Sequence, residues 1–505
     1  MRRSSVLLTA AVGVAIAVAA PAQAAPFALG LTTTASDASP FLPGCGGPGE
    51  AAAGSVNYQN AEVETHSAVN PTNPNNVVAF WQQDRWNDGG SHGNRVGYST
   101  NGGGTWGHSA PRFSRCAGGA GLGEAGDFER ATDPWLSFSP NGRLHAITIG
   151  FDNSTARNAI LAAFSNDGGA TWSTPRVLRF DNPRAVGNNF NDKETITADP
   201  FNSSLVYATW QRIVSPSEKS AQKAYNNASS YASEAWFARS INGGASWEPA
   251  RSVFRDNGVF TQTIGNQVEV LADGSLINGF TLIRARTNRH NTRGYSVAVI
   301  HSPDKGDTWS DETIIDRLLV DDVTDPDTGH DVRTGDIIPD FAVDRSNTAT
   351  RGNVYAVWMD TRFNDGDHND ILLSRSTDGG YNWSAPVVAD KAPIGVDAFT
   401  AMVDVDELGR VAVSYYDFRN DVRGDGALST DFWVSHSHDG GRTFPDENRL
   451  TTRSFDMRTA PDALGYFVGD YTGLAHYGSV FHPAWVGAND GNLANPTDVF
   501  HRSAQ

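Results

Sequence analysis

Ser99-Thr100-Asn101-Gly102-Gly103-Gly104-Thr105-Trp106 is the first of six copies of one pattern, Ser-x-Asp/Asn-x-Gly-x-Thr/Ser/Asn-Trp/Phe. The other five copies are residues 165–172, 240–247, 302–309, 376–383 and 437–444. We expect the Asp or Asn side chain to accept hydrogen bonds from its own turn, the Gly to adopt a positive φ, and the aromatic residue to begin the next strand. Each copy therefore predicts a tight hairpin.

The copies recur every 60 to 75 residues or so, which is longer than the roughly 40 to 50 residues of common single-blade repeats. Three strand-like runs precede each copy. In the first repeat they are residues 63–69, residues 77–81 and the run that leads into Ser99. Four strands per repeat with Gly-rich turns between them are typical of a propeller blade.

A seventh repeat is present at the C-terminus without its final hairpin. Residues 466–475, 478–485 and 498–503 match the three runs, and the chain ends soon after Ser503. The apolar segment 27–33 is a candidate for the missing outer strand, because pairing the two ends would remove an open sheet edge. We predict an all-β protein, a β-propeller of seven four-stranded blades closed by its N- and C-terminal strands; six blades are the alternative.

The first 24 residues are typical of a secretory signal peptide. Arg2 and Arg3 precede an apolar run over residues 6–20, and Ala22-Gln23-Ala24 resembles a cleavage site. A membrane anchor is the alternative, but the run is shorter than the roughly 20 residues that a spanning helix needs. We therefore expect a secreted, extracellular protein without a membrane span, with an N-terminal extension over residues 25–55 and the propeller over residues 56–505.

The composition argues against one class of binding partner and bears on the state of the cysteines. The 505 residues include 39 Lys and Arg against 57 Asp and Glu, a formal net charge of -18, which disfavours nucleic-acid binding by a basic surface. The only cysteines are Cys45 and Cys116. In an oxidising compartment they are expected to form a disulfide, and free thiols are the alternative. A monomer is expected.

The predicted functional face is the one opposite the hairpins, where inner strands start and second strands end. Candidates for chemistry there, each occurring once among the repeats, are His66, Arg130, Glu194 and Tyr471, and further acids at inner-strand starts are Asp133 and Asp470. Second-strand ends supply Arg85, Arg212, Arg362 and Arg419. An aromatic-Asp-Arg pattern recurs in three blades, which favours ion pairs between blades over repeated catalytic groups. The longest insertion, residues 213–233, is predicted to form a short helical lid.

The six hairpin patterns resemble the Asp-box, or bacterial neuraminidase repeat, and the whole mature chain is similar to secreted proteins of the sialidase superfamily. Residues 267–276 are similar to the stretch that follows the glutamate partner of the sialidase tyrosine nucleophile, and Gly265 stands at the position of that glutamate. The resemblance implies Tyr471 as nucleophile, Glu194 as its activator and Asp133 as acid/base.

The same resemblance implies a function in carbohydrate chemistry. Arg85, Arg130 and Arg362 would hold an anionic sugar, with Arg212, Arg419 and Asp470 completing the binding funnel. The predicted function is a secreted, sialidase-like glycoside hydrolase that acts on extracellular glycans, anionic ones included. Two alternatives stay open. One is a polysaccharide lyase acting on uronates, with His66 and Tyr471 transferring protons, and the other is a non-catalytic propeller that binds glycans or proteins.

No cofactor is required for this chemistry, but one loop is a candidate calcium site. Asp325-x-Asp327-x-Gly329-x-Asp331 places oxygen ligands at alternate positions, and Asp365-x-Asp367-x-Asn369 repeats that spacing. The acidic chain gains from a counter-ion in this segment. A simple solvated loop is the alternative.

Overall fold

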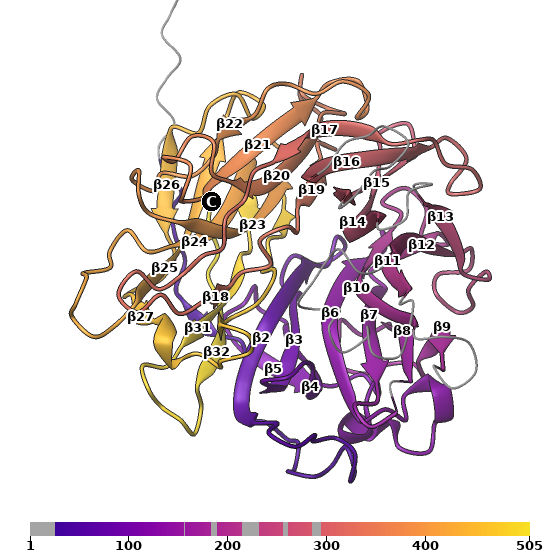
Figure 1. Ribbon diagram of the computed structural model, residues 1–505. Helices are drawn as coiled ribbons and strands as arrows, with labels where there is room; N and C mark the ends of the chain where they lie inside the picture. The colour runs from indigo at the N-terminus through magenta and orange to yellow at the C-terminus, as the bar shows by residue number, and fades with distance from the viewer. Residues whose placement is uncertain (1–25, 156, 183–188, 215–231, 256–260, 285–293) are drawn as a thin grey trace, which may run out of the picture.

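The computed structural model is built almost entirely of antiparallel β-strands (Figure 1). It describes residues 26–155, 157–182, 189–214, 232–255, 261–284 and 294–505. The predicted signal peptide and most of the predicted lid at 213–233 lie outside these residues. Among the residues that are described, no helix has the length and apolar character needed to cross a membrane.

Six units of four consecutive strands follow one another along the chain, each an antiparallel meander. The first and second are β2 (Asn57–Val69), β3 (Val77–Trp86), β4 (Ser91–Ser99), β5 (Trp106–Ser109), and β6 (Arg130–Phe138), β7 (Leu144–Phe151), β8 (Asn158–Ser165), β9 (Arg176–Asp181). The third and fourth are β10 (Asn189–Ala198), β11 (Val206–Val214), β12 (Ala232–Ser240), β13 (Arg251–Phe254), and β14 (Thr261–Val270), β15 (Leu276–Arg284), β16 (Gly294–Ser302), β17 (Thr313–Leu318). The fifth and sixth are β19 (Asp340–Val343), β20 (Val354–Asp360), β21 (Asp370–Ser376), β22 (Val387–Val388), and β23 (Ala398–Val405), β24 (Val411–Asp417), β25 (Ser429–Ser437), β26 (Asp446–Arg449).

The C-terminal strands form a further sheet with the N-terminal strand. β31 (Ala484–Ala488) pairs with β32 (Thr497–His501), and β32 pairs with β1 (Thr33–Thr34). An isolated bridge between Leu29 and Ala504 extends the contact. The segment predicted as the missing outer strand therefore runs along β32, although only its end is regular strand.

The predicted first run of this last repeat, residues 466–475, differs from expectation. Its start, β28 (Tyr466–Phe467), pairs in parallel with β18 (Val332–Arg333), which lies between the fourth and fifth units. Only Gly473 bridges to Ala484 in the manner of an inner strand. The two short strands β29 (His476–Tyr477) and β30 (Val480–Phe481) form a separate hairpin.

Neighbouring sheets pack side by side around a common centre, which gives a β-propeller-like all-β fold (Figure 1). The first strands β2, β6, β10, β14, β19 and β23 contact one another in that order. The last sheet contacts both ends of the series. Its Val486 backbone exchanges hydrogen bonds of 2.9 and 3.0 Å with the Tyr416 hydroxyl in β24, and Thr497 bonds to the Glu62 backbone in β2.

All six predicted hairpins form the expected turn. In the second copy, the Gly169 amide donates to the Ser165 hydroxyl at 2.9 Å, and the Thr171 amide donates to the Asp167 carboxylate at 2.9 Å. Equivalent bonds occur in the other five copies. The aromatic residue opens a strand only in the first copy, at Trp106; in the other five it precedes the strand.

Large aromatic side chains from the second strands fill the spaces between sheets. Trp81, Trp210, Trp358 and Trp485 are all at most 1% exposed. Trp485 stacks on Phe432 of the sixth unit with ring centroids 5.4 Å apart. At about 25 cal/mol per Å2, the 150–250 Å2 that such a ring buries corresponds to roughly 4–6 kcal/mol each.

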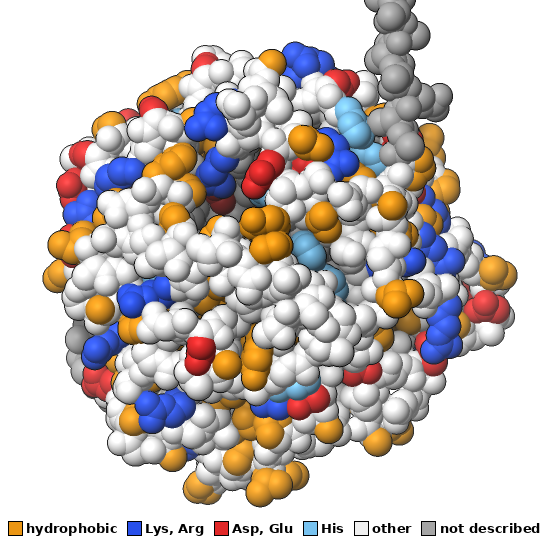
Figure 2. Space-filling model, turned by 180° about the vertical axis from the view of Figure 1, so that it is seen from behind, with side chains coloured by type: hydrophobic (Ala, Val, Ile, Leu, Met, Phe, Trp, Pro, Cys, Tyr) orange, Lys and Arg blue, Asp and Glu red, His pale blue; other side chains and the backbone are white. Residues whose placement is uncertain are grey.

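Outside the sheets, a disulfide between Cys45 and Cys116 fastens the N-terminal extension to the first unit, with the two Cα atoms 5.0 Å apart. The outer surface is mixed in character. Figure 2 shows acidic and basic side chains scattered over one face, with hydrophobic side chains in separate groups among them.

Candidate functional site

The first strands of five units share a β-bulge. The register against the second strand shifts at the same place in β2, β6, β10, β14 and β23. One residue in each bulge has a positive φ, and these residues are Glu64, Asp133, Lys193, Gly265 and Thr400. At residues other than glycine such a backbone costs about 1–3 kcal/mol, and a bulge re-aims the side chain that it carries. Strained, aligned positions at the centre of the molecule single out this region as the candidate site.

Three carboxyl groups surround the ammonium group of Lys193. Its Nζ lies 3.1 Å from Glu64 Oε1, 3.3 Å from Asp133 Oδ2 and 2.7 Å from Asp470 Oδ2. The Lys193 side chain is 10% exposed and the three acids are at most 5% exposed. Three bulges therefore bring their charged groups to one point. We call Glu64, Asp133, Lys193, Arg333 and Asp470 the Lys193 cluster.

Arg333 joins this cluster through the short parallel pairing of β18 with β28. Its Nε and Nη2 donate to the Asp470 carboxylate at 3.1 and 2.6 Å. The Phe467 ring contacts two guanidinium groups, and its centroid is 4.3 Å from that of Arg333 and 4.8 Å from that of Arg85. Arg85 in turn donates to the Gln82 amide oxygen at 2.7 Å, and the Gln82 amide donates to Glu64.

The pKa values of the acids in the Lys193 cluster are shifted in opposite directions. Burial, followed by the charge of Asp133, raises the pKa of Glu64 well above its usual value. Burial opposes ionisation of Asp133 too, but the Lys193 charge outweighs it and lowers the pKa of Asp133. Likewise, Arg333 and Lys193 overcome burial and hold the pKa of Asp470 well below its usual range. The pKa of Glu64 is thus raised while the pKa values of its two neighbours Asp133 and Asp470 are lowered.

Tyr471 and Glu194 lie at the edge of this cluster. The Tyr471 hydroxyl donates to the Pro134 carbonyl at 3.1 Å, and burial, followed by the Glu64 charge, raises the pKa of Tyr471 well above its usual value. Neither carboxyl oxygen of Glu194 has a hydrogen-bond partner among the described residues, and burial followed by the Asp133 charge raises its pKa. The pairing of Glu194 with the Tyr471 hydroxyl that the resemblance implies is not formed.

Of the predicted substrate-binding arginines, Arg85 alone reaches the cluster. Arg130 is fully buried, donates to Asp88 at 2.7 Å and lies over the Trp86 ring. The remaining three bind carboxylates near the rim, through the pairs Arg212–Asp181 (2.7 Å), Arg362–Asp316 (2.7 Å) and Arg419–Glu447 (2.6 Å). The first two pairs connect neighbouring units, whereas the third stays within the sixth.

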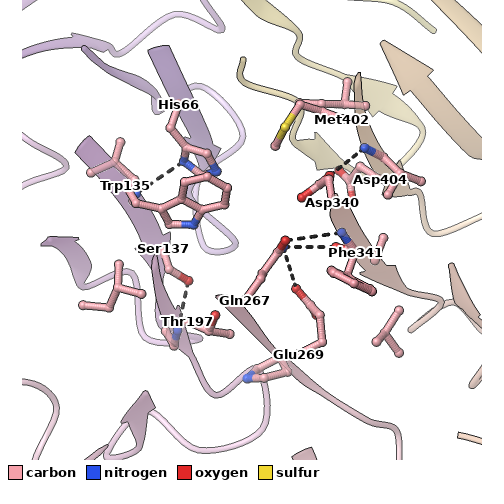
Figure 3. Close-up of a pocket in the computed structure, with 18 of the residues that line it drawn as sticks. His66, Trp135, Ser137, Thr197, Gln267, Glu269, Asp340, Phe341, Met402 and Asp404 are labelled. Atoms are coloured by element: carbon pink, nitrogen blue, oxygen red, sulfur yellow. Dashed lines mark hydrogen bonds between the residues drawn. The ribbon is translucent and has the colours of Figure 1, made fainter. Parts of the chain in front are cut away.

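A cavity of about 240 Å3 is lined by residues that follow the bulges along the first strands, among them His66, Trp135 and Gln267 (Figure 3). His66 and Trp135 lie on one side, stacked with ring centroids 3.9 Å apart, and Asp340 and Asp404 lie on the other. Burial lowers the pKa of His66 to about 3, so its imidazole is neutral. His66 therefore lines this cavity, on the side of the molecule where the hairpin turns lie.

The acidic wall of the cavity is also desolvated. Asp340 accepts a hydrogen bond from the Val403 amide at 2.7 Å through one oxygen, and its other oxygen has no partner among the described residues. Burial raises the pKa of Asp340 to about 8. Gln267 spans from the neighbouring strand and donates to the Phe341 carbonyl at 3.1 Å. The cavity is thus polar, with a protonated acid at neutral pH.

In the predicted calcium loop, a guanidinium group takes the place expected for a cation. Arg458 donates to Asp325 at 2.7 and 2.9 Å and to Asp327 at 3.0 Å. Asp331 lies next to this pair and its carbonyl accepts from the Tyr466 amide at 2.9 Å. Because Arg458 already neutralises two of the three carboxylates, these residues do not fit a calcium site, and Arg458 is the counter-ion that the acidic segment requires.

Sequence reasoning placed Asp133 and Asp470 in the site but missed the central role of Lys193. The available signal was position, because Lys193 occupies the same bulge in the third repeat as Glu64 and Asp133 do in the first two. Arg333 carried no such signal, since β18 lies outside the repeats. The fourth bulge carries no charged group, because its residue is Gly265. A Cβ at this position would lie only 3.1 Å from atoms of Ile338 and Pro339, so there is little room for a side chain.

No protein-family model matches the sequence, and no curated protein matches it. Among solved structures, the chain is similar to the Hadza microbial sialidase Hz136, with 16% identity over 75% of this chain and 67% of that chain and a TM-score of 0.47. It is similar to a Penicillium chrysogenum α-L-arabinanase with 12% identity over 72% and 93% of the two chains and a TM-score of 0.45. A Trypanosoma rangeli sialidase matches with 12% identity over 79% and 56% and a TM-score of 0.40.

Proposed function

We propose that this protein is a glycoside hydrolase whose active site is the Lys193 cluster. One observation carries the proposal: the carboxyl groups of Glu64 and Asp133 are held around the same ammonium group with pKa values shifted in opposite directions. Hydrolysis of a glycosidic bond uses a protonated acid and an ionised carboxylate in this way.

In this proposal Glu64 is the general acid that protonates the leaving oxygen of the sugar. Asp133 stays ionised and acts as nucleophile or as the base that activates water. Arg333, whose side chain is 25% exposed, would receive the anionic group of a sialyl or uronyl residue, and the buried Arg85 adds positive charge nearby. Tyr471 and Glu194 line the same site, and in this reaction Tyr471 remains a protonated hydrogen-bond donor.

The remaining features of the proposal concern architecture and export. We propose that the six four-stranded units and the β31–β32–β1 sheet are the seven blades of a propeller, with β1 closing the ring. We also propose that residues 1–24 direct secretion. The Cys45–Cys116 disulfide supports export, because such bonds persist in oxidising compartments.

A second candidate function is binding of a glycan without turnover. Three of the predicted substrate-binding arginines favour it. Arg212, Arg362 and Arg419 form ion pairs with carboxylates of the protein itself, so they serve the fold and not a catalytic centre. The carboxyl group of Glu194, which is buried at the centre and has no hydrogen-bond partner in the described part of the chain, argues against a purely structural role for the region.

The experiment compares the full mature chain with Glu64→Gln on panels of sialyl, uronyl and neutral glycans. We expect released sugar from wild type, a loss of at least about a hundredfold in kcat for the variant, and activity that declines as pH rises through the raised pKa of Glu64. Glu62→Gln is the matched control, because Glu62 is equally buried in the same strand but bonds to Gln83 instead.

Three outcomes separate the functions. Sugar released by wild type and by Glu62→Gln but not by Glu64→Gln supports the hydrolase. Unsaturated uronates, which absorb in the near ultraviolet, would reveal a lyase instead. Glycan binding without any product would identify the non-catalytic propeller and refute the proposed reaction.

A further inference from the structure

Two histidines and an aspartate that are not part of the Lys193 cluster meet at the hairpin of the sixth unit. His436 is the penultimate residue of β25, and Asp446, the first residue of β26, is its direct partner across the strands. His438 follows two residues after His436, in the turn. One ligand atom from each of the three residues lies within 4.8 Å of the others.

The three side chains lie close to one another. The imidazole rings of His436 and His438 are inclined at 70° with centroids 4.9 Å apart. His436 Nε2 lies 3.9 Å from Asp446 Oδ2. That distance exceeds a hydrogen bond, and Asp446 Oδ2 is buried with no hydrogen-bond partner among the described residues. A buried carboxylate oxygen without a partner is costly, and a cation between these groups would relieve that cost.

The surroundings hold this arrangement in place. His436 is fully buried and stacks on the Phe27 ring at 3.9 Å. Phe27 is itself fixed to β26, because its backbone exchanges hydrogen bonds of 2.9 and 3.0 Å with the Asn448 side chain. His438, in contrast, is exposed. The site is therefore rigid on its inner side and open to solvent on its outer side.

From this geometry we infer that His436, His438 and Asp446 bind a divalent transition-metal ion of the zinc class. Two imidazole nitrogens and a carboxylate oxygen suit zinc, cobalt or nickel, whereas calcium and magnesium prefer oxygen ligands alone. Three protein ligands leave a fourth position of the tetrahedron open to water or to an added ligand.

The sequence itself distinguishes this hairpin from the other five. The residue after the first Ser of the pattern is His438 here, whereas the other copies have Thr100, Asn166, Ile241, Pro303 and Thr377. Only the sixth copy thus combines a histidine inside the turn with a histidine in the strand before it. The turn works equally well without His438, so turn geometry does not account for it.

The test uses untagged, full-length mature protein that has been stripped of metal and titrated with cobalt(II). We expect one equivalent to bind, with the visible absorption of four-coordinate cobalt, and zinc to displace it. His438→Ala and Asp446→Asn should each weaken binding by at least about tenfold. Both variants spare the buried His436, and their circular dichroism and melting curves report on folding.

His368→Ala is the matched control. His368 also lies beside a carboxylate, with its Nδ1 3.2 Å from Asp365, but among the described residues it belongs to no group of three side chains that could hold a metal ion, so this variant should bind cobalt as wild type does. Equal affinity in wild type and in folded His438→Ala, or no cobalt or zinc binding in wild type, would overturn the inference. No glycan enters the assay, so the outcome is independent of the proposed hydrolase.

Discussion

Replacing Lys193 by Met should destabilise the protein strongly at neutral pH. The ammonium group of Lys193 lies within 3.3 Å of Glu64, Asp133 and Asp470 and is the charge that favours ionisation of Asp133. Removing one partner of a buried ion pair costs about 3–5 kcal/mol. For 505 residues the entropy of unfolding is about 1 kcal/mol/K, so Tm should fall by about 3–5 °C.

The loss should depend on pH in a defined direction. Asp133 and Asp470 have lowered pKa values in the folded protein, so their stabilising contribution is present above the unfolded-state pKa of about 3.9 and disappears as pH falls. The difference in Tm between wild type and Lys193→Met should therefore shrink below about pH 4. Calorimetric melts at pH 7 and at about pH 2.5, below the unfolded-state pKa, measure it. Lys391→Met, at an exposed lysine, is the control. Equal Tm values for the two variants at pH 7 would refute the reasoning.

Three other substitutions follow from the fold. Cys45→Ala with Cys116→Ala opens a loop spanning 71 residues, which should cost about 4 kcal/mol and be seen as a lower Tm; wild type in reductant should match it, and an unchanged Tm would contradict it. Arg458→Met leaves Asp325 without its counter-ion, so Tm should fall and added calcium should raise Tm in the variant only; a calcium effect on wild type would contradict this. Phe27→Ala should cost about 3–5 kcal/mol and promote aggregation detectable by size-exclusion chromatography, since Phe27 is 5% exposed and fixes the segment that covers β32.

Much of the fold could be predicted from the sequence because the hairpin pattern is local. A side chain such as that of Asp167 satisfies the backbone of its own turn, so the residues that form the turn are contiguous. The weakest prediction was the last repeat, where Tyr466 and Phe467 pair in parallel with β18. That pairing joins segments more than 130 residues apart, and no periodicity records it.

The candidate site was only partly predictable, for a related reason. Asp133 and Asp470 could be placed near the centre because they begin strand-like runs. The direction of their side chains depends on bulges, which change the alternation of a strand without any fixed sequence signature. No sequence motif singles out Lys193. Its importance follows from its three acidic neighbours in the folded structure.

The pairing of β1 with β32 imposes an order on folding. Thr33 pairs with His501, so the backbone pairing between β1 and β32 cannot form until His501 has been synthesised. During that time the earlier units can form from neighbouring segments, whose loop-closure cost is small, whereas the contact of highest sequence separation must come last. A chain that ended before β32 would leave β1 without its pairing partner and the neighbouring sheet with an unpaired edge.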